Sequence, residues 1–319
     1  MAALTRYKIL ISFALVLGIG MTCLSAYIRL SDSGHDCEPW PACYGDEIVL
    51  DASPGIAISR EDTNRELRVM HRGMASLFGL VVVFLAALSV WFRNNDNFPI
   101  VLPAVCLLLT VVLALVGMNA PDVLHPRVTL YNLTGGMVLN GCLLMCLLTT
   151  GKQLPAISVP RALLVCFIMT GVIMMISSGA WVSANFAAAG CESFLQCPSS
   201  GDSSLIQAFS LDRELSLIGG GIHFTAEQST ILFAHHCLVV VIFLLVALTG
   251  YIHYRTCGLG MFSLAAVILV VLIAFIRVNS DTSGLLPASL HNVSGMLLVF
   301  AVIKQLHDIV QSGVEVADD

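Results

Sequence analysis

Four of the nine histidines of the chain stand just inside long apolar segments, where bulk water cannot solvate an imidazole. They are His71, His235, His236 and His291. A polar side chain in hydrocarbon is costly, so such a histidine normally faces other helices and has a partner there. Two imidazoles that project from different helices into a bundle core suit a six-coordinate haem iron. The competing interpretation is a pair of histidines that only form interhelical hydrogen bonds.

An internal duplication repeats the segments that contain these histidines. The residue types match at a constant offset of 154 in three pairs: Ala26 and Ala180, Cys37 and Cys191, Cys43 and Cys197. Each set follows a long apolar segment, so we interpret the chain as two copies of one membrane unit. Duplicated membrane units commonly place a site within each half or between the halves.

The two halves offer different side chains at matching positions. His71 opens an apolar segment of the first half, and His235 opens its counterpart in the second half. His291 opens the last segment, whereas Tyr131 stands at the matching position of the first half. His236 competes with His235 as a ligand, but adjacent helical residues point about 100° apart. The alignment with His71 favours His235, so we predict haem ligation by His235 and His291.

Composition places the chain in the membrane class. Hydrophobic residues make up 57% and charged residues only 11%, whereas soluble domains have about 25% charged residues. The net charge of −6 and the lack of a basic cluster argue against nucleic-acid binding. Apolar segments of about 20 residues, enough to cross a bilayer, lie near 8–30, 70–92, 98–119, 128–150, 160–184, 229–252, 257–278 and 285–308. We predict an all-α polytopic membrane protein with eight transmembrane helices, arranged as two repeated four-helix bundles over residues 1–153 and 154–319.

The basic residues predict the orientation in the lipid bilayer. By the positive-inside rule, both termini are cytoplasmic, because one side receives Arg6, Lys8, Arg93, Lys152, Arg161, Arg255 and Lys304. The long loops near 31–69 and 185–228 are then outside, where disulfides persist. We therefore predict short disulfide loops from Cys37 with Cys43 and from Cys191 with Cys197. A zinc site is disfavoured, because no histidine stands at zinc spacing from these cysteines.

The first outer loop resembles a known family. Residues 29–45 read Arg-Leu-Ser-Asp-Ser-Gly-His-Asp-Cys-Glu-Pro-Trp-Pro-Ala-Cys-Tyr-Gly, which is similar to the first outer-loop motif of the haem A synthases. His71-Arg72 looks like the His-Arg pair of that family, and His291 is similar to its last haem-ligand histidine. The second loop keeps the cysteines but lacks the Trp-Pro pair. The resemblance covers nearly the whole chain.

The resemblance implies an activity and its cofactor. Haem A synthases are eight-span enzymes that oxidise a ring methyl of haem O, through an alcohol, to the formyl group of haem A. By resemblance, His235 and His291 hold haem b, and the N-terminal half receives the substrate haem O near His71 and Tyr131. A bacterial inner-membrane location and work with haem O synthase and cytochrome oxidase assembly factors are also implied. Arg72 is a candidate partner for a haem propionate; snorkelling to the membrane surface is the alternative.

Two departures from the family pattern bear on catalysis. Arg68 occupies the glutamate position of the family's Glu-x-x-His-Arg motif, and the nearest carboxylate is Glu66, five residues before His71. Tyr131 replaces a histidine; a tyrosinate can ligate ferric haem, but a neutral phenol is a poor ligand. We expect a haem A synthase-like oxidoreductase with His71, Tyr131 and Glu66 in catalytic roles. The alternatives are a non-catalytic b-type haem protein for electron transfer or oxidase assembly, and a haem-free transporter or structural membrane protein.

Overall fold

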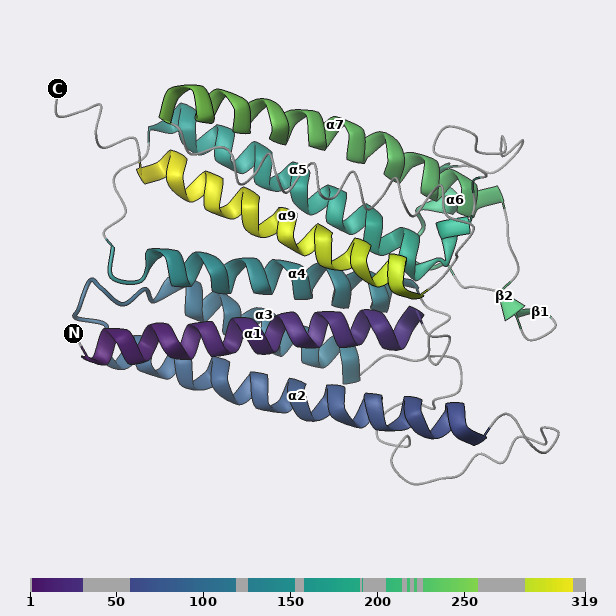
Figure 1. Ribbon diagram of the computed structural model, residues 1–319, viewed down its shortest axis with the longest axis horizontal. Coiled ribbons are helices and arrows are strands. Elements are labelled where there is room, and N and C mark those ends of the chain that lie inside the picture. Colours follow the sequence, from purple (N-terminus) through teal and green to yellow (C-terminus); the bar gives the residue numbers. More distant parts are fainter. Residues whose placement is uncertain are drawn as a thin grey trace.

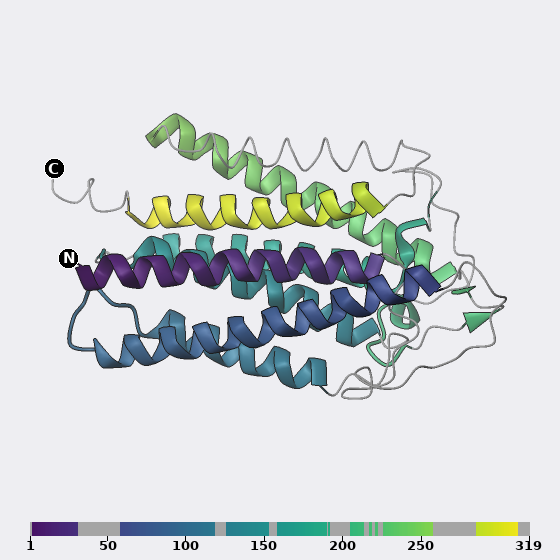
Figure 2. The same ribbon diagram turned by 60° about the horizontal axis from the view of Figure 1, so that its bottom comes forward.

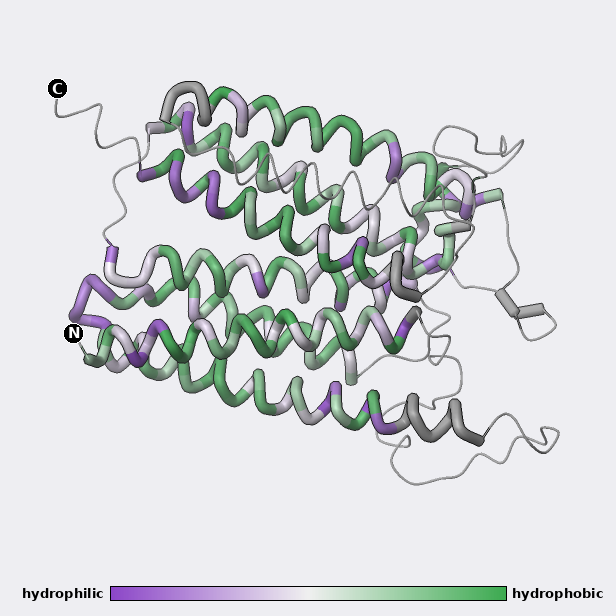
Figure 3. The backbone as a smooth tube through the Cα atoms, in the orientation of Figure 1, coloured by the Kyte–Doolittle hydropathy of each residue, from purple (hydrophilic) through white to green (hydrophobic). Residues whose placement is uncertain are grey.

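The fold consists mainly of long, roughly parallel and antiparallel helices (Figure 1). The computed structural model describes residues 2–30, 58–118, 126–152, 158–189, 191, 205–213, 217–218, 221–222, 226–257 and 285–311. Seven helices in these ranges are long and apolar enough to cross a membrane. They are α1 (Ala2–Leu30), α2 (Ile58–Trp91), α3 (Val101–Met118), α4 (Pro126–Thr149), α5 (Val159–Ala184), α7 (Ala226–Cys257) and α9 (Leu285–Gln311). Hydrophobic residues fill most of their middle turns (Figure 3).

These helices fit the predicted multi-pass membrane protein. Seven of the eight predicted spans coincide with a described helix, and the span at 257–278 lies almost entirely outside the described residues. α7 and α9 run in the same direction (Figures 1 and 2), as they must if one further crossing separates them. We call the end of the bundle where α1 ends and α2, α4, α7 and α9 begin the site end.

The first four helices enclose one core. α1, α2, α3 and α4 each pack on the next, and α4 packs back on α1. Tyr7 and Ile11 of α1 meet Phe78 and Leu85 of α2 and Leu143 of α4 in this buried cluster. Tyr7 also shares a hydrogen bond of 2.5 Å with Ser89 Oγ, which satisfies both hydroxyl groups in an apolar setting. The N-terminal half is thus a four-helix arrangement; its repetition in the second half stays a prediction.

The last helix joins the two halves. α9 lies mainly along α4 and α1, and makes smaller contacts with α5 and α7. At Gly141 of α4 the approach is so close that an added Cβ would lie 2.7 Å from Cδ1 of Ile303 in α9. A single buried cluster accordingly combines residues of α4, α5, α7 and α9. The described helices thus pack across the predicted boundary between residues 153 and 154, and the division of the chain into two halves stays a prediction.

Local sequence explains how several helices begin. Pro126 opens α4, and α5 has Ser158 at its N-cap position with a proline in its first turn, where the missing N–H costs nothing. α2 begins at Ile58, twelve residues before the predicted span, because the polar residues from Ser59 to Arg68 continue the helix beyond its apolar part. Hydropathy marks the membrane-spanning part of a helix and not its full length.

Small elements gather at the site end. They are the 3-10 turn η2 (Ala187–Ala189), the short helix α6 (Leu205–Ala208) and the strands β1 (Leu217–Ile218) and β2 (Gly221–Ile222), which pair antiparallel. Cys191 in this region is disulfide-bonded. Its partner, like Cys37, Cys43 and Cys197, lies outside the described residues, so both predicted pairings stay predictions.

Candidate functional site

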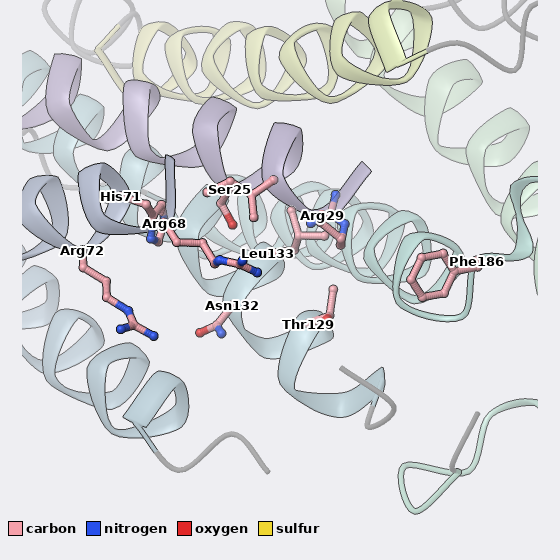
Figure 4. Close-up of a pocket in the computed structure, with 10 residues that line it drawn as sticks. Ser25, Arg29, Arg68, His71, Arg72, Thr129, Asn132, Leu133 and Phe186 are labelled. Carbon is pink, nitrogen blue, oxygen red and sulfur yellow. The ribbon is translucent and has the colours of Figure 1, made fainter. Parts of the chain in front are cut away.

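A pocket of about 240 Å³ lies at the site end of the N-terminal half (Figure 4). Three helices line it, and each contributes residues at positions i, i+3 and i+4, which share one helical face. They are Ser25, Ile28 and Arg29 of α1, Arg68, His71 and Arg72 of α2, and Thr129, Asn132 and Leu133 of α4. Phe186, from the turn after α5, completes the lining.

The pocket is strongly cationic. Arg29, Arg68 and Arg72 bring three guanidinium groups to it, and its described lining contains no aspartate or glutamate. Nε and Nη2 of Arg29 are buried, and no described residue offers them a hydrogen-bond partner. Figure 4 shows Arg68 extending from α2 toward α4, whereas Arg29 lies farther along the pocket. The buried guanidinium of Arg29 is expected to be offset by an anion.

The pocket brings some of the predicted site residues of the first half together and not others. His71 and Arg72 line the pocket together, whereas Tyr131 and Glu66 do not. Tyr131 is 43% exposed, and the neighbouring Asn132 faces the pocket in its place. Glu66 is exposed on α2, five residues before His71 and so on a different face. Tyr131 and Glu66 thus lie outside the described lining, and their catalytic roles stay predictions.

Sequence reasoning missed several residues of the pocket. Arg68 was read only as the replacement of a family glutamate, although its spacing of three and four from His71 and Arg72 puts all three on one face. Arg29 was read as part of a loop motif. The same spacing also groups Ser25 with Arg29 and Thr129 with Asn132, so helical periodicity was a signal for most of the lining. Phe186 had no such signal.

Phe186 links the second half to this pocket. Its backbone lies in the left-handed region, with φ of 52°, which is uncommon for a residue other than glycine. The buried Asn185 before it donates from Nδ2 to the carbonyl of Trp181 over 2.9 Å, and Gln228 Nε2 donates to the Asn185 carbonyl over 2.7 Å. Strain of this kind costs about 1–3 kcal/mol and persists where surrounding contacts impose it. The first turn of α7 thus helps hold an aromatic ring at the pocket of the other half.

In the second half, His235 of α7 has a defined orientation against α5. Its Nδ1 lies 2.8 Å from Ser178 Oγ, and the same hydroxyl donates to the Met175 carbonyl over 2.8 Å. The hydroxyl has a single proton. With that proton on the Met175 carbonyl, which can only accept, Ser178 Oγ accepts from the Nδ1–H tautomer of His235. A neutral imidazole then presents its lone pair at Nε2. Metal-ligating histidines typically donate their other N–H in this way.

A glycine makes room for that ring. A Cβ added at Gly179 of α5 would lie 3.2 Å from Cε1 of His235, which is tighter than nearly all real Cβ contacts. His236, the competing candidate, has its ring centre 6.3 Å from that of His235, with the two planes 43° apart. The contacts of His235 with Ser178 and Gly179 therefore show that its ring packs against α5, and the choice of His235 over His236 as a haem ligand stays a prediction.

His291 lies at the same end of the bundle. It stands in the second turn of α9, and α9 contacts α7. The Nδ1 atom of His291 is buried, and its carbonyl accepts a hydrogen bond of 2.8 Å from Ser294 Oγ. No group of three or more His, Cys, Asp or Glu side chains in the described ranges is arranged to hold a bare metal ion. Imidazole is a common axial ligand of haem iron, whose porphyrin supplies the other ligands, and haem ligation by His235 and His291 stays a prediction.

Contacts at the site end fix α6 and the residues that follow it to both halves. Trp181 Nε1 of α5 donates to the Ala208 carbonyl over 3.0 Å. Arg127 at the start of α4 pairs with Asp212 over 2.9 Å, and Arg213 approaches Glu227 of α7 to 3.9 Å. Burial lowers the pKa of the Arg213 guanidinium, and Glu227 opposes that shift. These contacts hold the segment from 205 to 213 over the ends of the helices that surround the sites.

Comparison with known proteins identifies the family. The family model described as cytochrome oxidase assembly protein, COX15-CtaA, matches residues 8–303. A heme A synthase from Shewanella oneidensis is 30% identical over 206 residues, which make up 59% of this chain and 60% of that relative. The alignment thus spans less than two thirds of the relative. Because the family model covers nearly all of the helical bundle, the chain belongs to the COX15-CtaA family of cytochrome oxidase assembly proteins, as its resemblance to the haem A synthases predicted.

Proposed function

We propose that the protein is a haem-modifying membrane oxidoreductase that oxidises a methyl group of haem O to the formyl group of haem A, with haem b as its cofactor. The observation that carries this proposal is the placement of three histidines at one end of the bundle. His71 lines a pocket in the first half, whereas His235 and His291 lie on contacting helices of the second. The heme A synthase from Shewanella oneidensis supports the assignment of this reaction class.

In this proposal the second half binds the haem b cofactor and the first half binds the substrate. His235 and His291 would hold haem b, which when bound supplies one-electron redox chemistry. Ser178 keeps the proton of His235 on Nδ1 and so fixes the ring with Nε2 as the donor atom. His71 would face the iron of the substrate. Tyr131 and Glu66 receive no contact with the substrate in this proposal, because neither lines the pocket.

The setting of the reaction follows from the predicted orientation. We place the protein in a bacterial inner membrane with both termini in the cytoplasm, so that the site end faces outward. Haem O would come from a haem O synthase, and cytochrome oxidase assembly factors would receive the product. The family's description as cytochrome oxidase assembly proteins supports this placement.

Haem extraction after expression with a source of haem O tests the proposed reaction. We expect mass spectrometry to find the alcohol or the formyl derivative in cells that express the protein, and not in cells with an empty vector. A purified protein with a b-type haem spectrum and no modified haem in the extract would contradict the enzymatic proposal.

A non-catalytic b-type haem protein is the second candidate function. The observation that favours it is the composition of the pocket: Arg68 stands where the family has glutamate, and the described lining contains no carboxylate. Without a carboxylate beside His71 there is no anionic general base to accept protons from the methyl group. Such a protein would transfer electrons or hand over haem during oxidase assembly.

Removal of the Ser178 hydroxyl is expected to weaken haem binding without abolishing it. Ser178→Ala deletes the acceptor that fixes the His235 ring, and loss of such an outer partner typically costs about 10–100-fold in affinity. Haem titration of the purified variant measures the affinity, and a redox titration of the bound haem measures its midpoint potential. Ser178→Thr keeps the hydroxyl and should restore both values. A Ser178→Ala protein with unchanged affinity and potential would contradict this role.

A further inference from the structure

We propose that Gln228, in the first turn of α7, is a positioning residue for the pocket of the first half. It acts through Phe186: by holding the turn that carries this residue, it fixes the direction of an aromatic ring that lines the pocket. The inference rests on the proposed function, because it takes the His71 pocket as the place where the substrate binds. It gives the second half a share in shaping the substrate site of the first.

Two hydrogen bonds hold the chain just before Phe186. Gln228 Nε2 donates to the Asn185 carbonyl over 2.7 Å, and Asn185 Nδ2 donates to the Trp181 carbonyl over 2.9 Å. The Asn185 carbonyl belongs to the planar peptide group that joins Asn185 to Phe186, so Gln228 fixes the orientation of that group directly. Gln228 and Asn185 are 1% and 0% exposed, so bulk water does not readily replace a lost hydrogen bond here.

The backbone of Phe186 depends on such support. Its φ of 52° lies in the left-handed region, which costs free energy for a residue with a side chain and persists where surrounding contacts impose it. The chain continues at once into η2, whose first residue, Ala187, is fully buried. A rotation of the peptide group before Phe186 would relieve the strain and turn the ring in another direction. The hydrogen bond from Gln228 opposes that rotation.

The ring of Phe186 lies at one end of the pocket. Figure 4 shows it at the opposite end from His71 and Arg72. In the part of the chain that the structure describes, Phe186 is the one lining residue that comes from the second half. An aromatic surface contributes a large apolar contact to a bound ligand. A displaced ring would therefore weaken substrate binding without a change at His71.

α7 and α5 join this support to the proposed haem b site. Gln228 precedes His235 by seven residues, which is two helical turns or about 10 Å along the axis, so the two side chains share one face of α7. On α5, Ser178 contacts His235 and Trp181 accepts from Asn185. The alternative role of Gln228 is to stabilise this junction of α5 and α7 without an effect on the pocket.

A fluorine label on the ring separates these two roles. 4-Fluorophenylalanine is incorporated at position 186 of the 319-residue chain, and the fluorine NMR spectrum is recorded in a neutral detergent. Gln228→Met keeps the length of the side chain but has no N–H donor. We expect it to shift or broaden the resonance by more than the wild-type line width. Thr230→Val is the matched control, because the Thr230 hydroxyl donates to the Ala226 carbonyl within α7.

A second variant covers the case in which Gln228→Met does not fold. Gln228→Asn keeps a polar amide at this buried position, but its side chain is one methylene shorter, so the donor no longer reaches the Asn185 carbonyl in the same geometry. We expect the same kind of change in the resonance. Near-ultraviolet circular dichroism and a single elution peak show that each variant is folded. Spectra that superimpose on the wild type would overturn the inference. Failure of both variants to fold would also overturn it, because Gln228 would then serve the stability of the bundle.

Substrate kinetics give the second measurement. With haem O as the substrate, we expect Gln228→Met to raise KM about two- to tenfold, the range that the net contribution of one hydrogen bond corresponds to, and to leave kcat close to the wild-type value. Phe186→Ala should raise KM as well. The double variant should have the KM of Phe186→Ala alone, because the ring that Gln228 positions is then absent.

The results of the kinetic experiment can contradict the inference in two ways. An additive rise of KM in the double variant would show that Gln228 affects binding by a route other than the Phe186 ring. A fall in kcat at unchanged KM would show that Gln228 acts on a later step. If the protein forms no haem A, the proposed function fails, and the fluorine spectrum still decides whether Gln228 positions Phe186. The two proposals thus fail on different results.

Discussion

Replacement of His235 by alanine is expected to remove the b-type haem absorbance of the purified protein, and replacement of His291 is expected to do the same. Both imidazoles lie at the site end on contacting helices, and His235 is already held by Ser178 with Nε2 as its donor atom. In the proposed haem site, loss of either imidazole would leave the iron with one protein ligand in place of two. Pyridine haemochrome analysis and a reduced-minus-oxidised spectrum measure the remaining haem.

His236→Ala is the matched control for this prediction. It removes an imidazole from the next position of α7, with its ring 6.3 Å from that of His235, and leaves the Ser178 hydrogen bond in place. We expect the His236 variant to keep its haem. If the His236 variant loses the haem and the His235 variant keeps it, the haem ligand on α7 is His236 and not His235. If all three variants keep a full b-type spectrum, the haem is held elsewhere and the proposed cofactor site is wrong.

Replacement of His71 by alanine is expected to abolish formation of modified haem and to leave haem b in place. His71 is the one imidazole among the described residues of the pocket, and the proposed haem b ligands, His235 and His291, belong to other helices. A loss of product at full haem b content therefore separates substrate binding from cofactor binding. Haem extraction with mass analysis reports the product, and the reduced spectrum of the same sample reports the cofactor.

Tyr131→Phe tests whether the substrate contacts the residues that line the pocket or the residue that matches His291 in the aligned halves. Tyr131 is 43% exposed and lies outside the pocket, so the loss of its hydroxyl should leave product formation close to the wild-type level. Asn132→Ala, which changes a lining residue, should reduce it. A Tyr131→Phe protein as inactive as His71→Ala would show that the tyrosine reaches the substrate, and the residue assignment on α4 would need to be reversed.

The number and order of the membrane helices could largely be predicted from the sequence, because about twenty consecutive apolar residues indicate a membrane-spanning helix. The rotation of each helix about its axis could not. Tyr131 and His291 match in the aligned halves, but Tyr131 is exposed whereas its neighbour Asn132 faces the pocket. Hydropathy indicates which residues of a helix lie in the membrane. The face of the helix that lines a site depends on the helices packed against it.

From the sequence, residues of the candidate site could be predicted only where a polar side chain is energetically costly to place in lipid. The histidines were recognised because an imidazole in hydrocarbon needs a partner. Arg29 and Arg68 were missed because arginine near a membrane surface commonly snorkels, and only the packing of α1, α2 and α4 shows that they converge. The residue before Phe186, Asn185, is held by hydrogen bonds with Trp181 and with Gln228, which is far from it in the chain. No local sequence pattern encodes such a position.

The position of α9 has a consequence for biogenesis. Its principal neighbours, α1 and α4, are synthesised first and fourth among the described spans, whereas α9 is the last of them to leave the ribosome. Until translation reaches residue 311, the surface that α9 covers on those early helices remains in contact with lipid or with insertion chaperones. A premature stop codon shortly before α9 would thus yield a chain that lacks His291 and exposes that surface of α1 and α4 to membrane proteases. Quality control of this protein is therefore expected to act on the completion of its final helix.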